Sequence, residues 1–509
     1  MSKKNFTPAQ KIAKESTITF FGLGYGQVVR YLFTVILTRL VGVHYLGIYS
    51  LGSSVTNIAT VISKAGTDVG LMRYISQKDT EKDQKTIQDD IRSTLKMGLV
   101  FSIVIMLVQI FLSSWLAETV FKESSLLRIV LIVYALSIPF MALMTIATFA
   151  TQGFQLLKYK TFVEYILNPT VLILSMLFLY FAFSSELAII LPTLLTGIIG
   201  FFVANYLLKK VAGVNIFDIG NIGFNKEILT YSLPIMFTVM IGTLLHWMDI
   251  MMLGYFTNTE TVGLYYPAVR TAGLQQSILI AFSGIFAPMF SKYFSQSDGN
   301  GMNHIYKLVT RWILTLVVPI FILIILFSEK IMLLFGTEFL QSADTLRILI
   351  IGTSIFSIFG VSSTALAVSG HQKMNLFNVI VASILNITLN IILIPKYGIM
   401  GAAIATLTSM SFIAVARLIE TGIFLKINPF NTKIFKPIIA GFITYGVLQF
   451  VKPNLMNFHT IITLIFAVII IFTTYGFILF IFKFDEDDKD FLRSLNFLKN
   501  KVVNSAVRK

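Results

Sequence analysis

The 509-residue sequence contains no cysteine, so disulfide bonds, thiolate metal ligands and cysteine nucleophiles are all excluded. Charged residues are scarce at 13%, whereas soluble domains have about 25%, and hydrophobic residues make up 56%. The five histidines show no H-x-x-x-H or H-E-x-x-H spacing, which argues against a zinc site. These shortages indicate an all-α polytopic membrane protein, and no metal or other cofactor is predicted.

The phosphate-binding pattern G-x-x-x-x-G-K-[ST] is also absent, so no ATP-binding loop of that kind is present. Any work against a gradient must therefore come from an ion gradient, the membrane potential or removal of product. The formal net charge is +15. In a membrane protein, basic cytoplasmic loops beside anionic lipid explain such a charge, so nucleic acid is not a predicted partner.

Apolar stretches of a length that can cross a bilayer recur about fourteen times along the chain. Their approximate bounds are 17–42, 46–70, 94–116, 125–150, 160–181, 186–208, 228–254, 262–290, 308–328, 344–368, 374–394, 398–425, 434–451 and 459–483. Lysine and arginine are concentrated in every second loop, beginning with the N-terminus. The positive-inside rule then predicts a multi-pass protein of the cell membrane with both termini cytoplasmic.

A weak internal repeat relates the two halves of the chain. Gly47-Ile48-Tyr49 matches Gly263-Leu264-Tyr265, although short Gly/Tyr loops can also match by chance. Parallel repeats predict two six-helix bundles around a central cavity, followed by two C-terminal helices. The predicted division is 1–215 for the N-lobe, 216–427 for the C-lobe, 428–484 for the last two spans and 485–509 for an amphipathic cytoplasmic tail.

Arg30 lies near the centre of the first predicted span, where a charge costs at least about 2.5–3.5 kcal/mol on insertion scales. Gln27, Arg30, Thr34 and Thr38 recur at three- or four-residue steps and therefore share one helix face. Because such a stripe cannot face lipid cheaply, it should face the protein interior or a water-filled cavity.

Other predicted spans carry polar stripes as well, and each admits a structural interpretation. Asn57, Lys64 and Asp68 share a face of the second span, where Lys64 and Asp68 could simply neutralise each other. Asp249 and Arg270 lie at similar depth and could form an ion pair that closes a hairpin. Glu164 could reach lipid headgroups. His246 could titrate near neutral pH or fill a helix interface.

The balance of these charges favours an anionic substrate, because arginine binds phosphate oxygens through two parallel hydrogen bonds. The residues predicted to bind substrate are Arg30, Arg270, Lys64, Gln27 and Asn57. Those predicted to couple an ion or to form charge pairs are Asp249, Asp68, Glu164 and His246. No catalytic residue is predicted.

The segment Leu333–Ser409 resembles the polysaccharide flippases of the multidrug/oligosaccharidyl-lipid/polysaccharide exporter superfamily, of the O-antigen and teichoic acid exporter type. The resemblance rests on Gly370-His371-Gln372-Lys373, on Asn386 and Asn390, and on the glycine-rich stretch that begins at Gly398. It implies two six-helix bundles in a V shape and alternating access that carries a lipid-linked oligosaccharide from the inner to the outer leaflet.

The implied partners are a glycan on polyprenyl phosphate or pyrophosphate, membrane lipids and glycan-assembly enzymes, and the chain is expected to be a monomer. One alternative is a proton- or sodium-coupled multidrug exporter of the sister branch. The basic stripes and the two extra spans disfavour it. A membrane glycosyltransferase or ligase is the other alternative, but the outer loops are short and show no carboxylate pair. A transporter rather than an enzyme is therefore predicted.

Overall fold

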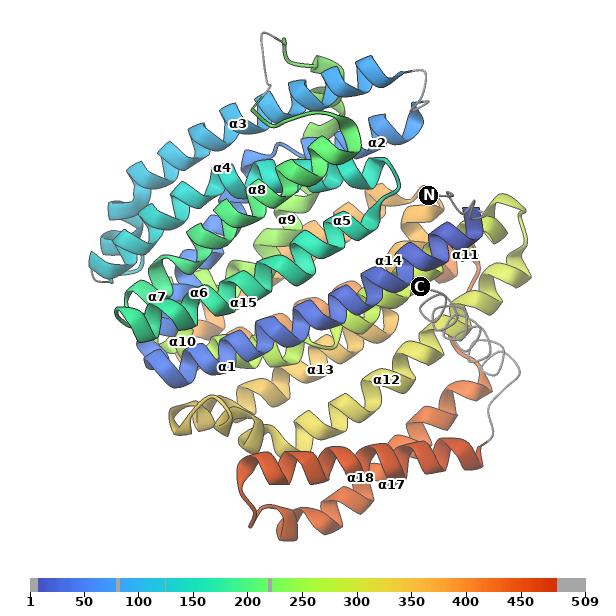
Figure 1. The fold of residues 1–509 in the computed structure, drawn as a ribbon. Helices are drawn as coiled ribbons and strands as arrows, with labels where there is room; N and C mark the ends of the chain where they lie inside the picture. Colours follow the sequence, from blue (N-terminus) through green and yellow to red (C-terminus); the bar gives the residue numbers. More distant parts are fainter. Residues whose placement is uncertain (1–7, 79–82, 124, 218–221, 483–509) are drawn as a thin grey trace, which may run out of the picture.

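The computed structural model describes residues 8–78, 83–123, 125–217 and 222–482. Within these ranges the chain forms helices and no strand, and long helices lie side by side across the molecule (Figure 1). In the described part of the chain, thirteen helical stretches are long and apolar enough to cross a membrane. The predicted all-α polytopic fold is therefore confirmed. The predicted tail 485–509 lies outside the described residues.

The helices of the described chain follow in this order. The first half contains α1 (Pro8–Ser63), α2 (Thr67–Gln77), α3 (Gln84–Ser114), the π-helix η1 (Trp115–Val120), α4 (Ser125–Gly153), α5 (Leu157–Thr161), the π-helix η2 (Phe162–Leu167), α6 (Asn168–Ala182), α7 (Leu187–Ile190) and α8 (Pro192–Ala212). The second half contains α9 (Lys226–Phe256), α10 (Thr259–Gly273), α11 (Gln276–Ser295), α12 (Gly299–Leu333), the 3₁₀ turn η3 (Thr337–Ser342), α13 (Ala343–Phe359), α14 (Val361–Val368), α15 (Gln372–Tyr397), α16 (Ile399–Leu425), the 3₁₀ turn η4 (Thr432–Ile434), α17 (Phe435–Leu455) and α18 (Thr460–Ile481).

The helix α1 is two membrane spans joined at Gly42. Its apolar part, Ile18–Ser63, has 46 residues, which is about 70 Å of helix and roughly twice the hydrocarbon thickness of a bilayer. Gly42 has φ 79° and ψ −175°, a conformation outside the helical region that a side chain would strain. With α1 counted as two spans, the number of crossing stretches agrees with the predicted fourteen.

The prediction of one continuous second span over 46–70 is wrong, because the helix is interrupted between Ser63 and Thr67. The helix ends at Ser63, because Ala65 and Gly66 adopt left-handed φ angles of 48° and 70°. The chain then resumes as α2, which continues to Gln77. This break places Lys64 at the bend between two helices, a site that hydrophobic length alone does not mark.

The helices pack as two groups with α1 between them (Figure 1). In the first group, the N-lobe, α4 packs against α3, α8 and α1. In the second group, the C-lobe, α16 packs against α15 and α13, and α12 packs against α11 and α13. Helices α17 and α18 pack on α12. Because α1 also packs along α9 and α10, it forms much of the junction between the lobes.

Two glycines allow the lobes to touch, and their contacts are reciprocal. A Cβ atom on Gly47 would lie 1.9 Å from the carbonyl oxygen of Thr259, and one on Gly263 would lie 2.1 Å from that of Val43. Thr259 lies one helical turn before Gly263, and Val43 lies one helical turn before Gly47. Each glycine therefore contacts the equivalent residue of the other repeat. Such an exchange of equivalent contacts is typical of a two-fold interface. It supports the relation between Gly47 and Gly263 that the sequence suggests.

Polar contacts join the lobes at the same end of the molecule. Arg39 donates from Nε to the carbonyl oxygen of Leu334 at 2.8 Å, and it also contacts the carbonyl oxygen of Leu333. These carbonyls end α12, where a cation is favourable because the helix dipole leaves partial negative charge. Thr259 donates to the carboxylate of Glu123. The lobes are therefore closely packed at the end where α1 bends.

Candidate functional site

Arg30 is half-buried on α1 and faces the helices of its own lobe. Its Nη2 donates to the backbone carbonyl oxygen of Glu164 in η2 at 2.9 Å. Among the described residues this is the sole hydrogen-bond partner of the guanidinium, and no carboxylate there forms an ion pair with it. Glu164 and Arg30 attract each other at longer range. Most donors of Arg30 are therefore left for another partner.

Arg270 comes from the other lobe and approaches the same region. Next to the two arginines, Tyr31 and Thr271 share a hydrogen bond of 3.3 Å between their hydroxyl oxygens, so α1 and α10 meet at this depth. The positive charges of Arg30 and Arg270 also repel each other across the junction. The fold therefore brings together, from separate lobes, the two residues that the sequence singled out for binding phosphate.

Aromatic rings hold the guanidinium of Arg270. It lies 4.8 Å from the ring centroid of Tyr266 and 5.5 Å from that of Trp247. Tyr49 of α1 packs edge-on against Tyr266 at 6.1 Å. Aromatic faces attract a cation through their quadrupole without neutralising its charge. The arginine is thus positioned while its net charge remains available.

Glycines beside the arginines leave open space. A Cβ atom on Gly24 of α1, Gly242 of α9 or Gly273 of α10 would meet nothing within 4 Å. Gly273 lies one turn from Arg270, and Gly242 lies one turn before the exposed His246. The faces of α9 and α10 that carry His246 and Arg270 therefore have open space beside them.

His246 is exposed and packs its ring edge-on against Trp247 at 5.4 Å. It also lies within electrostatic range of Arg270. Gln27 is half-buried on α1, and Asn57 is exposed with its Nδ2 donating to the carbonyl oxygen of Ser53 at 2.7 Å. Within the described residues, neither amide is hydrogen-bonded to Arg30 or Arg270.

Lys64 and Asp68 form an ion pair of 2.8 Å within the N-lobe, with side-chain exposures of 14% and 7%. Glu164 accepts a hydrogen bond from Thr148 of α4 at 2.9 Å. Its carboxylate therefore points into the lobe, where it interacts with Lys160 rather than with lipid headgroups. Lys64 and Asp68 thus neutralise each other, whereas Arg30 has no ion-pair partner among the described residues.

Asp249 is buried in the C-lobe and is not paired with Arg270 among the described residues. It accepts hydrogen bonds from Tyr265 at 3.0 Å and from Nδ2 of Asn390 at 2.7 Å, and Thr406 contacts it as well. Asn386 accepts from Asn390 at 3.0 Å. The side-chain oxygen of Asn390 is buried without a partner in the described chain. The result is a dense set of oxygen atoms around one carboxylate.

The sequence singles out Asp249 as a coupling residue and Asn386 and Asn390 by resemblance, but it does not place the three residues together. Asn386 and Asn390 are one turn apart within an apolar span, and Thr406 follows on the next span. Buried amides on one helix face require polar partners, and Asp249 is one. No binding role was predicted for Tyr265, Tyr266 or Trp247, because aromatic residues are common in membrane spans and carry no spacing signature.

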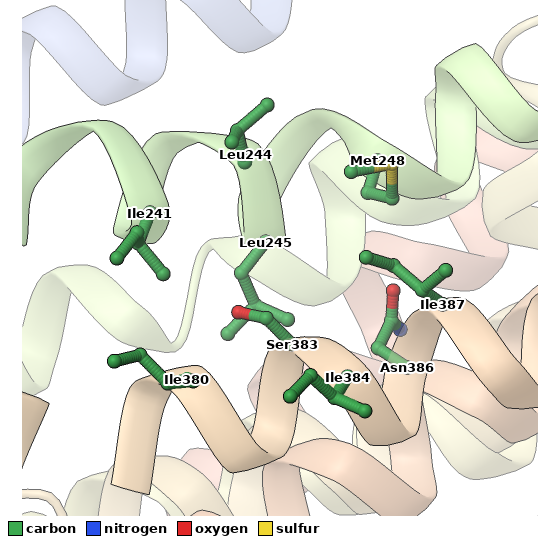
Figure 2. A pocket seen from close by; sticks show the side chains of 9 residues that line it. All are labelled: Ile241, Leu244, Leu245, Met248, Ile380, Ser383, Ile384, Asn386 and Ile387. Carbon is green, nitrogen blue, oxygen red and sulfur yellow. The ribbon is translucent and has the colours of Figure 1, made fainter. Parts of the chain in front are cut away.

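An apolar cavity of about 180 Å³ lies beside this cluster, between α9 and α15 (Figure 2). Its lining residues are Ile241, Leu244, Leu245, Met248, Ile380, Ser383, Ile384, Asn386 and Ile387. Because apolar side chains form most of the wall, this cavity is unsuited to a phosphate group. The charged site is therefore at the arginines rather than here.

Comparison with known proteins identifies related folds and sequences. The lipid II flippase MurJ in an inward closed conformation superposes with a TM-score of 0.73 over 92% of this chain and 98% of that one, at 18% identity. An inward-facing multidrug resistance MATE transporter superposes with a TM-score of 0.67 over 81% and 98%, at 15% identity. At these identities, the likeness concerns the fold.

Archaeal sequences are similar as well. A probable low-salt glycan biosynthesis flippase of Haloferax volcanii, Agl15, is 27% identical over 46% of this chain and 50% of its own length. An uncharacterised membrane protein of Methanocaldococcus jannaschii is 22% identical over 79% and 82%. The match thus spans about half the length of the named flippase and most of the uncharacterised protein.

The fold and the site define a multi-pass helical membrane protein with a pair of arginines between two lobes. The family model described as polysaccharide biosynthesis protein matches residues 12–294, which is more than half of the chain. The chain therefore belongs to this family. A second model, MatE, matches residues 234–392.

Proposed function

We propose that the protein is a flippase that moves a lipid-linked glycan from the inner to the outer leaflet by alternating access of its two lobes. The observation that carries this proposal is the approach of Arg30 and Arg270 from separate lobes to one depth, with open space beside Gly273 next to Arg270. A phosphate bound by both arginines would offset their repulsion. It would therefore link substrate binding to the relative position of the lobes.

The chemistry of a lipid-linked glycan fits this arrangement. The polyprenyl tail can remain in lipid, whereas the phosphate and the sugars cannot cross hydrocarbon without a large desolvation cost. Arg30 and Arg270 are assigned to the phosphate or pyrophosphate, and Gln27 and Asn57 to the polar path. Lys64 is a weaker candidate, because Asp68 already neutralises it.

The names of similar proteins agree with this assignment. Agl15 and AglR of Haloferax volcanii are described as probable flippases, and MurJ is described as a lipid II flippase. On this basis the substrate is a glycan on polyprenyl phosphate or pyrophosphate. The protein would act as a monomer in the cell membrane with both termini cytoplasmic, beside glycan-assembly enzymes. The lobes would be 1–215 and 216–427, followed by two spans in 428–484.

Asp249 is the best-supported residue for coupling transport to an ion. The carboxylate, the unpartnered oxygen of Asn390 and the hydroxyl of Thr406 are hard oxygen donors, which suit a small cation such as sodium. A proton on the carboxylate would serve as well. Asp68 and Glu164 are weaker candidates, because Lys64 and Thr148 already engage them.

A cation-coupled multidrug exporter is the second candidate function, and the MatE match over residues 234–392 favours it. Organic cations would be repelled by Arg30 and Arg270, so this function requires a different binding site. We also propose a transporter rather than a glycosyltransferase or ligase.

Reconstitution in liposomes tests the proposal. A fluorescent lipid-linked oligosaccharide should reach the opposite leaflet faster than in empty vesicles, and Arg30→Ala and Arg270→Ala should each slow it at least tenfold. Arg347→Ala serves as the control, because Arg347 pairs with Glu329 and Asp344 away from the arginine pair. Movement no faster than in empty vesicles, together with export of a cationic dye, would favour the multidrug exporter instead.

A further inference from the structure

The partner of Arg30 exists because of an irregular helix. The π-helix η2 separates α5 from α6, and in it the amide of Asn168 donates to the carbonyl oxygen of Val163, five residues earlier. In a regular α-helix that amide would bond to the carbonyl of Glu164 instead. The π turn therefore leaves the Glu164 carbonyl dependent on the amide of residue 169.

Residue 169 is proline, which has no amide hydrogen. The carbonyl of Glu164 therefore has no backbone donor from either position. The amide of Asn168 donates to Val163 instead, and residue 169 has no amide hydrogen. A carbonyl in a membrane span needs a donor, since no water is available there. Arg30 supplies it from α1, with Nη2 at 2.9 Å from the oxygen.

Two glycines let α1 come close enough for this bond. A Cβ atom on Gly26, one turn before Arg30, would lie 2.7 Å from the carbonyl oxygen of Tyr165. A Cβ atom on Gly22, a further turn back, would lie 2.2 Å from Cγ2 of Thr161. Small residues at four-residue spacing are typical of tightly packed membrane helices. Helix α1 is thus seated against the segment that contains the free carbonyl.

We propose that Pro169 is a positioning residue for Arg30: by withholding an amide from Glu164, it creates the acceptor that fixes the guanidinium toward the junction of the lobes. This inference rests on the proposed function, in which Arg30 binds the phosphate. A free arginine loses much side-chain entropy when it is ordered by a ligand. One bond to a fixed carbonyl removes part of that cost beforehand and leaves the remaining N–H groups for phosphate oxygens.

The carboxylate of Glu164 does not perform this role. It accepts a hydrogen bond from Thr148 at 2.9 Å, and among the described residues it forms no ion pair with Arg30. A neutral carbonyl orients the cation without cancelling its charge. The arrangement therefore combines order with a net positive charge, which is what a phosphate site requires.

The test restores the missing amide. Pro169→Ala should raise the half-saturating concentration of a polyprenyl pyrophosphate-linked oligosaccharide roughly tenfold in liposomes, because a hydrogen bond to a charged group is lost, with little change in maximal rate. Pro192→Ala is the matched control, since Pro192 also begins a helix of the N-lobe but has no such carbonyl against Arg30. If Pro169→Ala has the same half-saturating concentration as the wild type, the inference is overturned.

A backbone ester separates the amide from the ring. A chain in which lactic acid replaces Pro169 lacks the N–H but also lacks the pyrrolidine, and it should keep wild-type half-saturation. If this ester weakens binding as much as alanine does, the ring and not the absent amide matters, and the inference fails. If the alanine variant does not fold, an ester that weakens binding still overturns the inference, because the ester lacks the N–H.

A double-mutant cycle connects Pro169 to Arg30. In an Arg30→Ala background, Pro169→Ala should have no further effect on half-saturation, whereas in an Arg270→Ala background its tenfold effect should persist. Equal effects in both backgrounds overturn the inference. Wild-type protein that moves no lipid-linked glycan would instead refute the proposed function, so the two failures are distinguishable.

Discussion

The guanidinium of Arg30 and the backbone carbonyl oxygen of Glu164 lie 2.9 Å apart, although 134 residues separate them in sequence. The partner of this membrane-embedded cation is thus a neutral carbonyl rather than a carboxylate. An ion pair would have cancelled the charge, and breaking it would have exposed an unpaired acid. Arg30 instead keeps its positive charge, and the same holds for Arg270 against Tyr266 and Trp247.

Lysine should not replace Arg270. Arg270→Lys keeps the charge but loses the planar group that packs on Tyr266 and Trp247 and binds phosphate with two parallel bonds. We expect the half-saturating concentration of a pyrophosphate-linked substrate to rise roughly tenfold, measured in the leaflet assay. Arg347→Lys, at a surface ion pair, should leave it unchanged. Equal affinity for Arg270→Lys and wild type would show that charge alone suffices.

The reciprocal glycine contacts should hold the lobes together at the end where α1 bends. Gly263→Ala places a methyl group against the carbonyl of Val43, so the junction must open. Because the chain has no native cysteine, His44→Cys and Glu260→Cys provide the two attachment sites for spin labels. Pulsed electron paramagnetic resonance should then show longer distances in Gly263→Ala than in the parent.

Gly446→Ala is the control for this experiment, because a Cβ atom there meets nothing within 4 Å. Its distance distribution should match that of the parent. An unchanged distribution in Gly263→Ala would mean that the contact does not restrain the lobes.

The pair Lys64–Asp68 should contribute to stability rather than to substrate binding. Asp68→Asn leaves the largely buried lysine without its counter-charge. Removing one partner of a buried ion pair lowers the free energy of unfolding by about 3–5 kcal/mol. The melting temperature in detergent should fall, and the double variant Lys64→Met with Asp68→Asn should recover much of the loss. Transport by the double variant close to wild type would support this role, and its abolition would place Lys64 in the substrate path.

Asp249 should be required for ion-dependent transport. Asp249→Asn keeps the size of the side chain but removes the charge that a cation would neutralise. We expect the stimulation of transport by an imposed sodium or proton gradient to disappear, while slow gradient-independent movement persists. Glu329→Gln, at the surface pair with Arg347, should respond to gradients like the wild type. Full stimulation in Asp249→Asn would exclude this carboxylate as the coupling site.

The sequence was sufficient for the membrane spans, because hydrophobic length follows directly from the bilayer. It was also sufficient to single out Arg30, since an arginine in the middle of a span is costly without a reason. The breaks at Gly42 and at Ala65–Gly66 were harder to place. They are set by the backbone conformation of one or two residues, which hydropathy does not report.

The partners of the charged residues could not be derived from the sequence. Asp249 and Arg270 suggested an ion pair by depth alone, yet Asp249 is bound by Tyr265, Asn390 and Thr406, all of which come from other spans of the C-lobe. Such contacts depend on how helices rotate about their axes. A span of uniformly apolar residues gives little information about that rotation, so polar partners appear only in the assembled fold.

The proposed transport depends most on whether Arg30 and Arg270 together recognise the charged linkage of the substrate. The most direct measurement compares leaflet crossing of two lipids that carry the same oligosaccharide, one through pyrophosphate and one through a neutral ether. Wild-type protein should move the pyrophosphate form much faster, and Arg30→Gln with Arg270→Gln should remove this preference. Equal rates for the two lipids in the wild type, or an undiminished preference in the double variant, would contradict the account.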